Sequence, residues 1–203
     1  MKKIIGISGK LASGKDTISE MIADILNIPV EKYTFSKKLK DIVSILTGEE
    51  MQKIKNLPYA NTIYDYTREQ KNKFLPIWNK TLGEYLQQLG TDVMRKHFDY
   101  DIWIKSLFET DGKQCLNRGN IMTIPDVRFV NEADEIIKRG GLLIRVNGDP
   151  LKIRANTSRD VNHISETALD YYNNFNYVVD NDIPNKLILK DKIYEILKLE
   201  KYF

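Results

Sequence analysis

Residues 9–17 read GKLASGKDT and match the phosphate-binding pattern G-x-x-x-x-G-K-[ST] at every position except the last, where aspartate replaces the hydroxyl residue. The stretch follows an apolar run, KKIIGIS at residues 2–8. It precedes apolar residues at helical spacing, which are Ile18, Ile22, Ile25 and Leu26. A strand, a glycine-rich turn and an amphipathic helix in this order are the context that a phosphate loop requires, and a structural glycine turn is the alternative.

The predicted loop has the groups that bind a nucleoside triphosphate. Its backbone N–H groups can surround a phosphate, and the helix that begins near Gly14 directs its positive end at the anion. Lys15 would reach the β- and γ-phosphates. The residues that we predict to hold the nucleotide, which we expect to be ATP, are Gly9, Ala12, Ser13, Gly14, Lys15, Asp16 and Thr17.

Asp16 is the departure from the common pattern. A carboxylate beside a triphosphate is strongly repelled unless a cation lies between them. We therefore expect Asp16 to hold Mg²⁺ directly or through water, while Thr17 hydrogen-bonds the α-phosphate. The alternative is that Asp16 only caps the helix, because a negative charge is favoured in the first helical turn.

Charge is balanced along the chain, with 31 basic and 28 acidic residues among 203. The one short basic cluster is SKKLK at residues 36–40. A nucleic-acid-binding protein more often concentrates its basic residues in a stripe, so we expect a small anionic ligand and no stable nucleic acid partner.

Hydropathy and cysteine content indicate in which cellular compartment we expect the protein. The apolar run after the first lysines is too short for a signal peptide, and no run approaches the roughly 18 residues of a membrane span, so we expect no membrane partner. One cysteine, Cys115, allows no intrachain disulfide, which suits a cytoplasmic protein. Its polar surroundings, TDGKQCLNRGN, predict a loop or surface position.

Short apolar runs alternate with segments of helical periodicity. The predicted strands are residues 2–8, 30–35, 120–129, 142–146 and 176–180. This alternation predicts a three-layer α/β/α P-loop fold with a five-stranded parallel sheet, in a single domain that spans residues 1–203.

The segments between the strands predict further features. Ser36 can cap a helix that ends at Gly48, with an apolar stripe at Leu39, Ile42, Val43 and Leu46. Thr81 and Glu84 form a capping box that opens another helix. Residues 49–80 have weak periodicity, and we interpret them as a local excursion from the core with short helices.

Five stretches carry a family resemblance. They are SGKDT (13–17), FSKKLK (35–40), LQQLGTDVMR (86–95), IPDVRFVNEA (124–133) and NYVVDND (176–182). In this order they resemble the deoxynucleoside monophosphate kinases of tailed phages and large DNA viruses, over nearly the full chain. The resemblance implies ATP- and Mg²⁺-dependent transfer of the γ-phosphoryl group to a deoxynucleoside monophosphate, which gives the diphosphate for DNA precursor synthesis.

Two other kinase classes and an inactive binding module stay open. The animal phosphomevalonate kinases resemble the chain at the G-K-D loop, and dephospho-coenzyme A kinases share the overall layout. A guanine-nucleotide switch is disfavoured, because the chain has neither N-K-x-D nor D-x-x-G. The resemblance also implies a homodimer and, for a viral protein, the host cytoplasm.

Phosphoryl transfer between two anions needs cations for both. Arg128 follows a predicted central strand, at the sheet edge where α/β proteins bind ligands, and the resemblance implies that it contacts the acceptor phosphate. We interpret residues 147–163 as a lid whose arginines close over the phosphates, with a solvated basic loop as the alternative. The predicted catalytic residues are Lys15, Arg128, Arg154 and Arg159.

We assign residues 36–108 as a helical acceptor-binding region within the domain. Trp103 is either part of the core or a stacking partner for a base, and Arg95 is a candidate second phosphate ligand. Asp126 is predicted to touch the acceptor, to orient Arg128 or to hold a magnesium-bound water, with a structural salt bridge as the alternative. Glu132 is predicted to touch the acceptor, with a solvated helix face as the alternative. The predicted substrate-binding residues are Lys10, Ser36, Lys37, Gln88, Gly90, Thr91, Arg95, Trp103, Asp126, Arg128 and Glu132.

Overall fold

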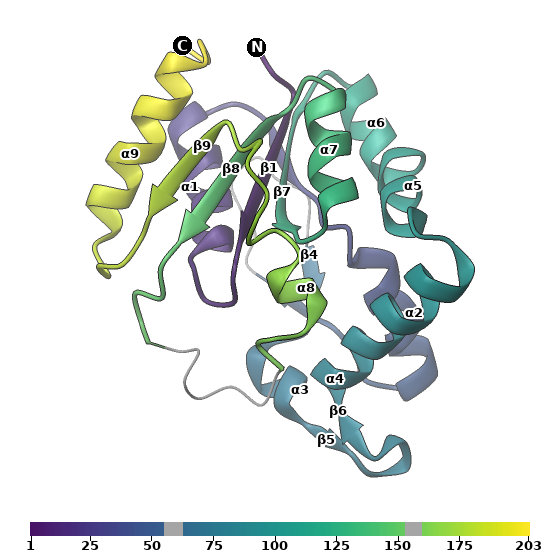
Figure 1. Cartoon of the computed structure of the whole chain (residues 1–203). Helices are drawn as coiled ribbons and strands as arrows, with labels where there is room; N and C mark the ends of the chain where they lie inside the picture. Colours follow the sequence, from purple (N-terminus) through teal and green to yellow (C-terminus); the bar gives the residue numbers. More distant parts are fainter. Residues whose placement is uncertain (55–62, 153–159) are drawn as a thin grey trace.

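The computed structural model describes residues 1–54, 63–152 and 160–203. Its central sheet has five parallel strands in the order β2-β7-β1-β8-β9, which confirms the predicted sheet (Figure 1). The strands are β1 (Ile4–Gly9), β2 (Val30–Lys32), β7 (Ile121–Val127), β8 (Leu142–Asn147) and β9 (Tyr177–Asp180).

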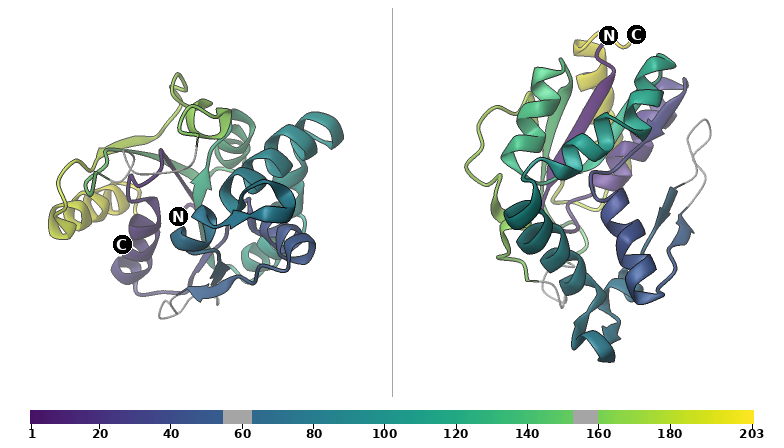
Figure 2. Two further views of the ribbon diagram at one scale, coloured as in Figure 1. Left: turned by 90° about the horizontal axis from the view of Figure 1, so that it is seen from below. Right: turned by 90° about the vertical axis from the view of Figure 1, so that its right-hand side faces the viewer.

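Helices cover both faces of the sheet, so the fold has the three predicted layers (Figures 1 and 2). Because side chains alternate along a strand, β1 contributes to two separate cores. Ile5 and Ile7 pack in one core with α1 (Lys15–Leu26) and α9 (Lys186–Leu199). Ile4 packs in the other, with α5 (Ile102–Phe108), α6 (Asp111–Asn117) and α7 (Val130–Lys138).

The connections open a crevice between the carboxyl ends of β1 and β7. The chain leaves β1 into α1 on one face of the sheet and leaves β7 into α7 on the other. The two strands are neighbours, with Ser8 paired to Val127 near their ends. Ligands of open α/β sheets bind at such a switch point, so the fold places residues after β1 and after β7 around one site.

The segment between β2 and α5 lies beyond the carboxyl ends of the strands (Figure 1). It begins with α2 (Lys37–Thr47) and continues through two small antiparallel pairs, β3 (Gln52–Ile54) with β4 (Ile63–Asp65) and β5 (Phe74–Leu75) with β6 (Lys80–Thr81). The helix α3 (Arg68–Asn72) and a 3₁₀ turn, η1 (Pro76–Trp78), separate these strands. Short helices therefore form only part of this excursion, and the strand pairs were not predicted.

The predicted helix after Thr81 changes type along its length. Thr81 and Glu84 make the predicted capping box at the start of α4 (Leu82–Gln87). From Gln88 the turns widen into a π-helix, η2 (Gln88–Phe98), and the chain breaks at Asp99 before α5. Wide helical turns frequently occur at functional sites. Here the widened turns carry Gly90, Thr91 and Arg95 into the crevice.

Two features of the helices contradict the sequence analysis. Cys115 is fully buried in α6 and not in a loop, because the face of α6 that meets the sheet is built from Gly112 and Cys115, too small to give an apolar periodicity. Burial raises the pKa of the Cys115 thiol to about 12. On α2 only Leu39 and Val43 of the predicted stripe are buried, whereas Ile42 and Leu46 are exposed.

The last short helix, α8 (Ile164–Thr167), lies at the carboxyl end of the sheet and is capped by the His163 ring, which accepts from the Ser165 N–H (3.2 Å). Across the described ranges, no helix combines the length and apolar character needed to cross a membrane.

Candidate active site

The loop between β1 and α1 has the conformation of a phosphate loop. Ala12 and Gly14 adopt positive φ angles of 62° and 98°, and the helix starts at Lys15. The Asn181 amide donates to the Ser13 carbonyl (2.8 Å) and lies 2.6 Å from where a Cβ on Gly14 would be. Both the backbone angle and this close approach require glycine at position 14.

Lys15 is buried at the base of the loop. Its ammonium donates to the Lys10 carbonyl (2.7 Å). Burial and, after it, repulsion by the neighbouring Arg128 guanidinium lower the pKa of Lys15 to about 7. An anion at this position would be favoured, since it restores the charged form of the lysine.

A cavity of about 410 Å³ opens from the loop into the region between α2, α4 and α5. Its apolar wall consists of Phe35, Leu39, Leu86, Trp103 and Phe129. Its polar lining includes Asp65, whose carboxylate pairs with Lys40 (2.8 Å) and Lys71 (3.2 Å). Although burial opposes ionisation there, the two ammonium groups lower the pKa of Asp65 to about 2. The cavity thus combines an apolar slot with charged groups.

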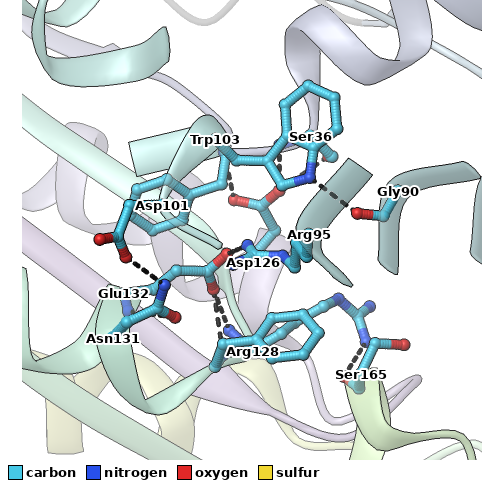
Figure 3. A network of polar contacts seen from close by, with 12 residues as sticks. Ser36, Gly90, Arg95, Asp101, Trp103, Asp126, Arg128, Asn131, Glu132 and Ser165 are labelled. Carbon is cyan, nitrogen blue, oxygen red and sulfur yellow. Dashed lines mark hydrogen bonds and ion pairs between the residues drawn. The ribbon is translucent and has the colours of Figure 1, made fainter. Parts of the chain in front are cut away.

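Arg128 follows β7 and lines the cavity together with Lys15, and its guanidinium lies beside Ser165 (Figure 3). Its Nη1 donates to the Ser165 carbonyl (3.0 Å) and pairs with the Glu166 carboxylate. Glu166 also accepts from the backbone N–H of Leu11 in the phosphate loop (3.0 Å). One carboxylate therefore joins the loop after β1 to the arginine after β7.

Asp126 holds the start of α2. Its carboxylate accepts from the backbone N–H groups of Phe35 (2.9 Å) and Ser36 (3.0 Å) and from the Ser36 hydroxyl (2.8 Å) (Figure 3). The predicted strand 30–35 ends early, at Lys32, and its last residues turn toward Asp126 instead. Ser36 precedes the first residue of α2, but its hydroxyl is bonded to Asp126 and does not cap the helix.

Arg95 and Glu132 form a buried ion pair in the wall of the cavity, with side chains 3% and 2% exposed (Figure 3). Arg95 also donates to the Tyr100 carbonyl (3.0 Å), and its guanidinium lies 4.1 Å from the centre of the Phe129 ring. Glu132 accepts from the backbone N–H groups of Arg128 (2.7 Å) and Phe129. These contacts fix the turn that carries Arg128, a role that the sequence analysis did not consider for this pair.

Asp16 accepts a hydrogen bond from the Lys32 ammonium (2.6 Å). The N-cap residue of α1 is Gly14, and Asp16 lies in the first turn of the helix, where a negative charge is favoured. The Asp16 carboxylate lines the cavity beside Lys15. One carboxylate that faces the phosphates fits Mg²⁺ in a kinase, which takes one or two carboxylates together with phosphate and water oxygens.

Most of the predicted site residues lie together around this cavity. Those that line it are Ala12, Lys15, Asp16, Ser36, Gly90, Thr91, Arg95, Trp103, Asp126, Arg128 and Glu132. Gly9, Ser13, Gly14 and Thr17 belong to the phosphate loop and the first turns of α1, outside the cavity wall. Trp103 also belongs to the buried core, and its indole N–H donates to the Gly90 carbonyl (3.0 Å).

Three of the predicted substrate-binding residues are not brought into the cavity. Lys10 pairs with Asp170 (2.8 Å), and Lys37 pairs with Asp41 (2.9 Å) on the outer side of α2. Gln88 is exposed and bonded to Lys80. Helix phase explains the last case, because Gln87, one position earlier, is the buried glutamine that lines the cavity. Arg154 and Arg159 lie outside the described residues.

The sequence analysis did not single out Glu166, Lys32 or Asn181. Lys32 and Asn181 each stand where a parallel strand ends, and the rule that placed Arg128 could have found them. Glu166 gives no such signal, since it sits in a four-residue helix that only the folded chain carries to the phosphate loop.

The site combines a phosphate loop after the central strand of a parallel sheet with an arginine and a cavity at the switch point. This combination defines a P-loop kinase. Shikimate kinase from Bacteroides thetaiotaomicron has a similar structure, with a TM-score of 0.50 over 99% of each chain and 13% sequence identity, and this likeness shows the fold alone. The sequence model of the deoxynucleotide monophosphate kinase family matches residues 61–193. The chain therefore belongs to the deoxynucleotide monophosphate kinase family, which makes it a nucleotide kinase by family and fold.

A relative matches most of the length of the chain. A protein of Acanthamoeba polyphaga mimivirus, provisionally assigned as a deoxynucleotide monophosphate kinase, is 28% identical over 197 residues and covers 88% of each chain.

Nucleotide binding should take up a proton. Near pH 8 the free Lys15 amine, with its pKa of about 7, is mostly neutral, and a bound triphosphate favours the ammonium form. We expect ATP binding to take up close to one proton near pH 8 and far less near pH 6. Calorimetry in two buffers with different ionisation enthalpies measures this uptake.

The matched variant is Lys15→Met, which keeps the length of the side chain but cannot be protonated. Its ATP complex should form with little proton uptake near pH 8. Equal uptake by the variant and the unmodified protein would show that another group takes the proton.

Proposed function

We propose that the protein transfers the γ-phosphoryl group of ATP to a deoxynucleoside monophosphate, with Mg²⁺ beside the phosphates. The observation that carries this proposal is the single cavity that runs from Lys15 and Arg128 to an apolar slot beside Trp103. A monophosphate whose phosphate meets Arg128 and whose base enters the slot fits these surroundings. Family membership supports the same acceptor class.

ATP binds at the phosphate loop. The backbone N–H groups at the start of α1 and the positive end of that helix face the β-phosphate, and Lys15 contacts the β- and γ-phosphates. Asp16 is the residue that would hold Mg²⁺, and it leaves Lys32 to do so. When bound, Mg²⁺ neutralises charge that develops on the phosphate oxygens.

The acceptor phosphate binds Arg128 across the crevice. The apolar wall, with Trp103 and Phe35, contacts the faces of the base, and the buried Gln87 amide meets its polar edge. Among residues 1–54, 63–152 and 160–203, the one hydrogen-bond partner of the Gln87 amide is the Asp160 carbonyl at 3.5 Å, so the amide can turn to a ligand. No general base is required, because the attacking oxygen of the acceptor phosphate is already anionic.

Transfer itself depends on position and charge. A loose transition state spreads negative charge over the oxygens of the γ-phosphoryl group, and Lys15 and Arg128 approach this group from two sides. We keep the lid at residues 147–163, with Arg154 and Arg159, as a further part of the proposal that excludes water during transfer. The acceptor-binding region at residues 36–108 holds the other substrate.

The direct test is to record ADP release from ATP and Mg²⁺ with each deoxynucleoside monophosphate in turn. Ribonucleotides, phosphomevalonate and dephospho-coenzyme A serve as competing acceptors. We expect turnover on the order of 1–100 per second with one or more deoxynucleotides, and its loss in Lys15→Ala. Turnover with phosphomevalonate or dephospho-coenzyme A alone would overturn the acceptor assignment and leave the phosphate-loop chemistry in place.

Gln87 and Gln88 form a matched pair for the acceptor pocket. Gln87→Ala removes an amide that lines the cavity, so we expect the KM of the acceptor to rise about 3- to 10-fold with little change for ATP. Gln88→Ala removes an exposed side chain and should leave both KM values unchanged. Steady-state kinetics with one substrate varied at a time gives the comparison. Equal effects of the two variants would place the base elsewhere.

Asp16→Asn tests the metal assignment. Loss of the carboxylate charge should raise the Mg²⁺ concentration for half-maximal rate by about tenfold, whereas Asp24→Asn, an exposed position on the same helix, should not. Titration of Mg²⁺ at saturating ATP measures the shift. An unchanged Mg²⁺ requirement in Asp16→Asn would mean that the carboxylate serves only the helix terminus and Lys32.

A further inference from the structure

Glu166 is almost completely buried at the carboxyl end of the sheet, with its side chain 3% exposed. It is close to two parts of the site that lie on different strands. One oxygen, Oε2, accepts from the Leu11 N–H in the phosphate loop (3.0 Å), and the other, Oε1, pairs with Nη1 of Arg128. Each oxygen of the carboxylate therefore has its own partner across the crevice.

These contacts engage only part of the Arg128 guanidinium. Its Nη1 meets Glu166 and the Ser165 carbonyl, both on α8. Within the part of the chain that the structure describes, Nε and Nη2 of Arg128 form no hydrogen bond. Arginine has five N–H donors in a rigid planar fork. An anchored Nη1 therefore fixes the direction in which the remaining donors point.

Charge supports the same arrangement. Arg128 and Lys15 are cations on neighbouring loops, and their repulsion contributes to the lowered pKa of Lys15. The Glu166 carboxylate acts in the opposite direction on both groups, because it favours the charged form of Lys15 and of Arg128. The carboxylate thus lets the two cations stay close before any phosphate is bound.

A second carboxylate on the same segment provides a contrast. Asp170 pairs with Lys10 of the phosphate loop (2.8 Å) and with Arg145 (3.1 Å). It anchors the segment to the loop just as Glu166 does, but no contact joins it to Arg128. Replacing Asp170 therefore tests the anchoring of the segment alone, whereas replacing Glu166 also tests the orientation of Arg128.

We propose that Glu166 is a positioning residue that orients Arg128 toward the transferred phosphoryl group and ties it to the phosphate loop. This inference rests on the proposed function, in which Arg128 contacts phosphate. The competing role is that Glu166 stands in for an anion and is displaced when phosphate binds. In that case its removal would strengthen phosphate binding and leave turnover intact.

The test is a double-mutant cycle with Glu166→Gln and Arg128→Ala, and Asp170→Asn is the matched control on the same segment. Glu166→Gln keeps the shape of the side chain and removes its charge. We expect kcat to fall about 10- to 100-fold in Glu166→Gln, while the KM of ATP changes less than about threefold. In the Arg128→Ala background, Glu166→Gln should have almost no further effect, because residues that act through one another are not additive.

Asp170→Asn should lower the rates of the unmodified protein and of Arg128→Ala by the same factor. Additive effects of Glu166→Gln and Arg128→Ala would overturn the inference, and so would an unchanged kcat with tighter binding of ATP or inorganic phosphate. Thermal unfolding of each variant identifies any loss of rate that comes from the fold.

A second readout needs no acceptor. Hindered rotation of the Arg128 guanidinium gives separate Nη signals in an NMR spectrum of arginine-labelled protein, and Arg128→Ala assigns them. These signals should average in Glu166→Gln and persist in Asp170→Asn, and their persistence in Glu166→Gln would overturn the inference. If no deoxynucleotide supports turnover in the unmodified protein, the proposed function fails, and this spectrum still decides whether Glu166 orients Arg128.

Discussion

The site depends on holding cations close together in a protein that must attract phosphate. Lys15 and Arg128 follow the carboxyl ends of adjacent strands, and both line the same cavity. Carboxylates next to these cations offset part of their charge. The buried Glu166 pairs with Arg128, and the exposed Asp16 pairs with the neighbouring Lys32. The fold brings the residues of each pair together from separate elements: Arg128 follows β7 and Glu166 lies on α8, whereas Asp16 lies on α1 and Lys32 ends β2.

Two further residues of the cavity wall, Glu132 and Arg95, hold the turn that carries Arg128. Glu132 holds the backbone N–H of Arg128 and pairs with Arg95, which comes from the widened helix η2. That helix also carries Gly90, where a Cβ would come within 2.5 Å of the Leu39 side chain. The helix η2 and the turn after β7 are thus joined through one buried ion pair. We expect changes in the cavity wall on η2 to affect the turn that carries the arginine.

The sequence predicted the sheet, the phosphate loop and the residues at strand ends, because these follow from local rules. Strand alternation sets the layers, and Arg128 and Asp126 need only the rule that ligands bind at the carboxyl edge. Prediction from the sequence failed for residues whose position depends on helix phase or on partners far away in the chain. Gln88 and Gln87 differ by one position, and only the start of the π-helix decides which one faces inward. Glu166 is far from Arg128 and Leu11 in sequence, so no spacing reveals the contact.

The burial of Cys115 has a practical consequence. The sole sulfhydryl of the chain is enclosed between α6 and the sheet, at a residue with no contact to the cavity, and its raised pKa keeps it protonated. Alkylating agents and oxidants act on thiolates, so the folded enzyme should be inert to them. The folded protein therefore has no reactive thiol of its own that would compete with introduced cysteines for fluorescent or spin labels. Distances across the crevice can be followed without first removing a native reactive group.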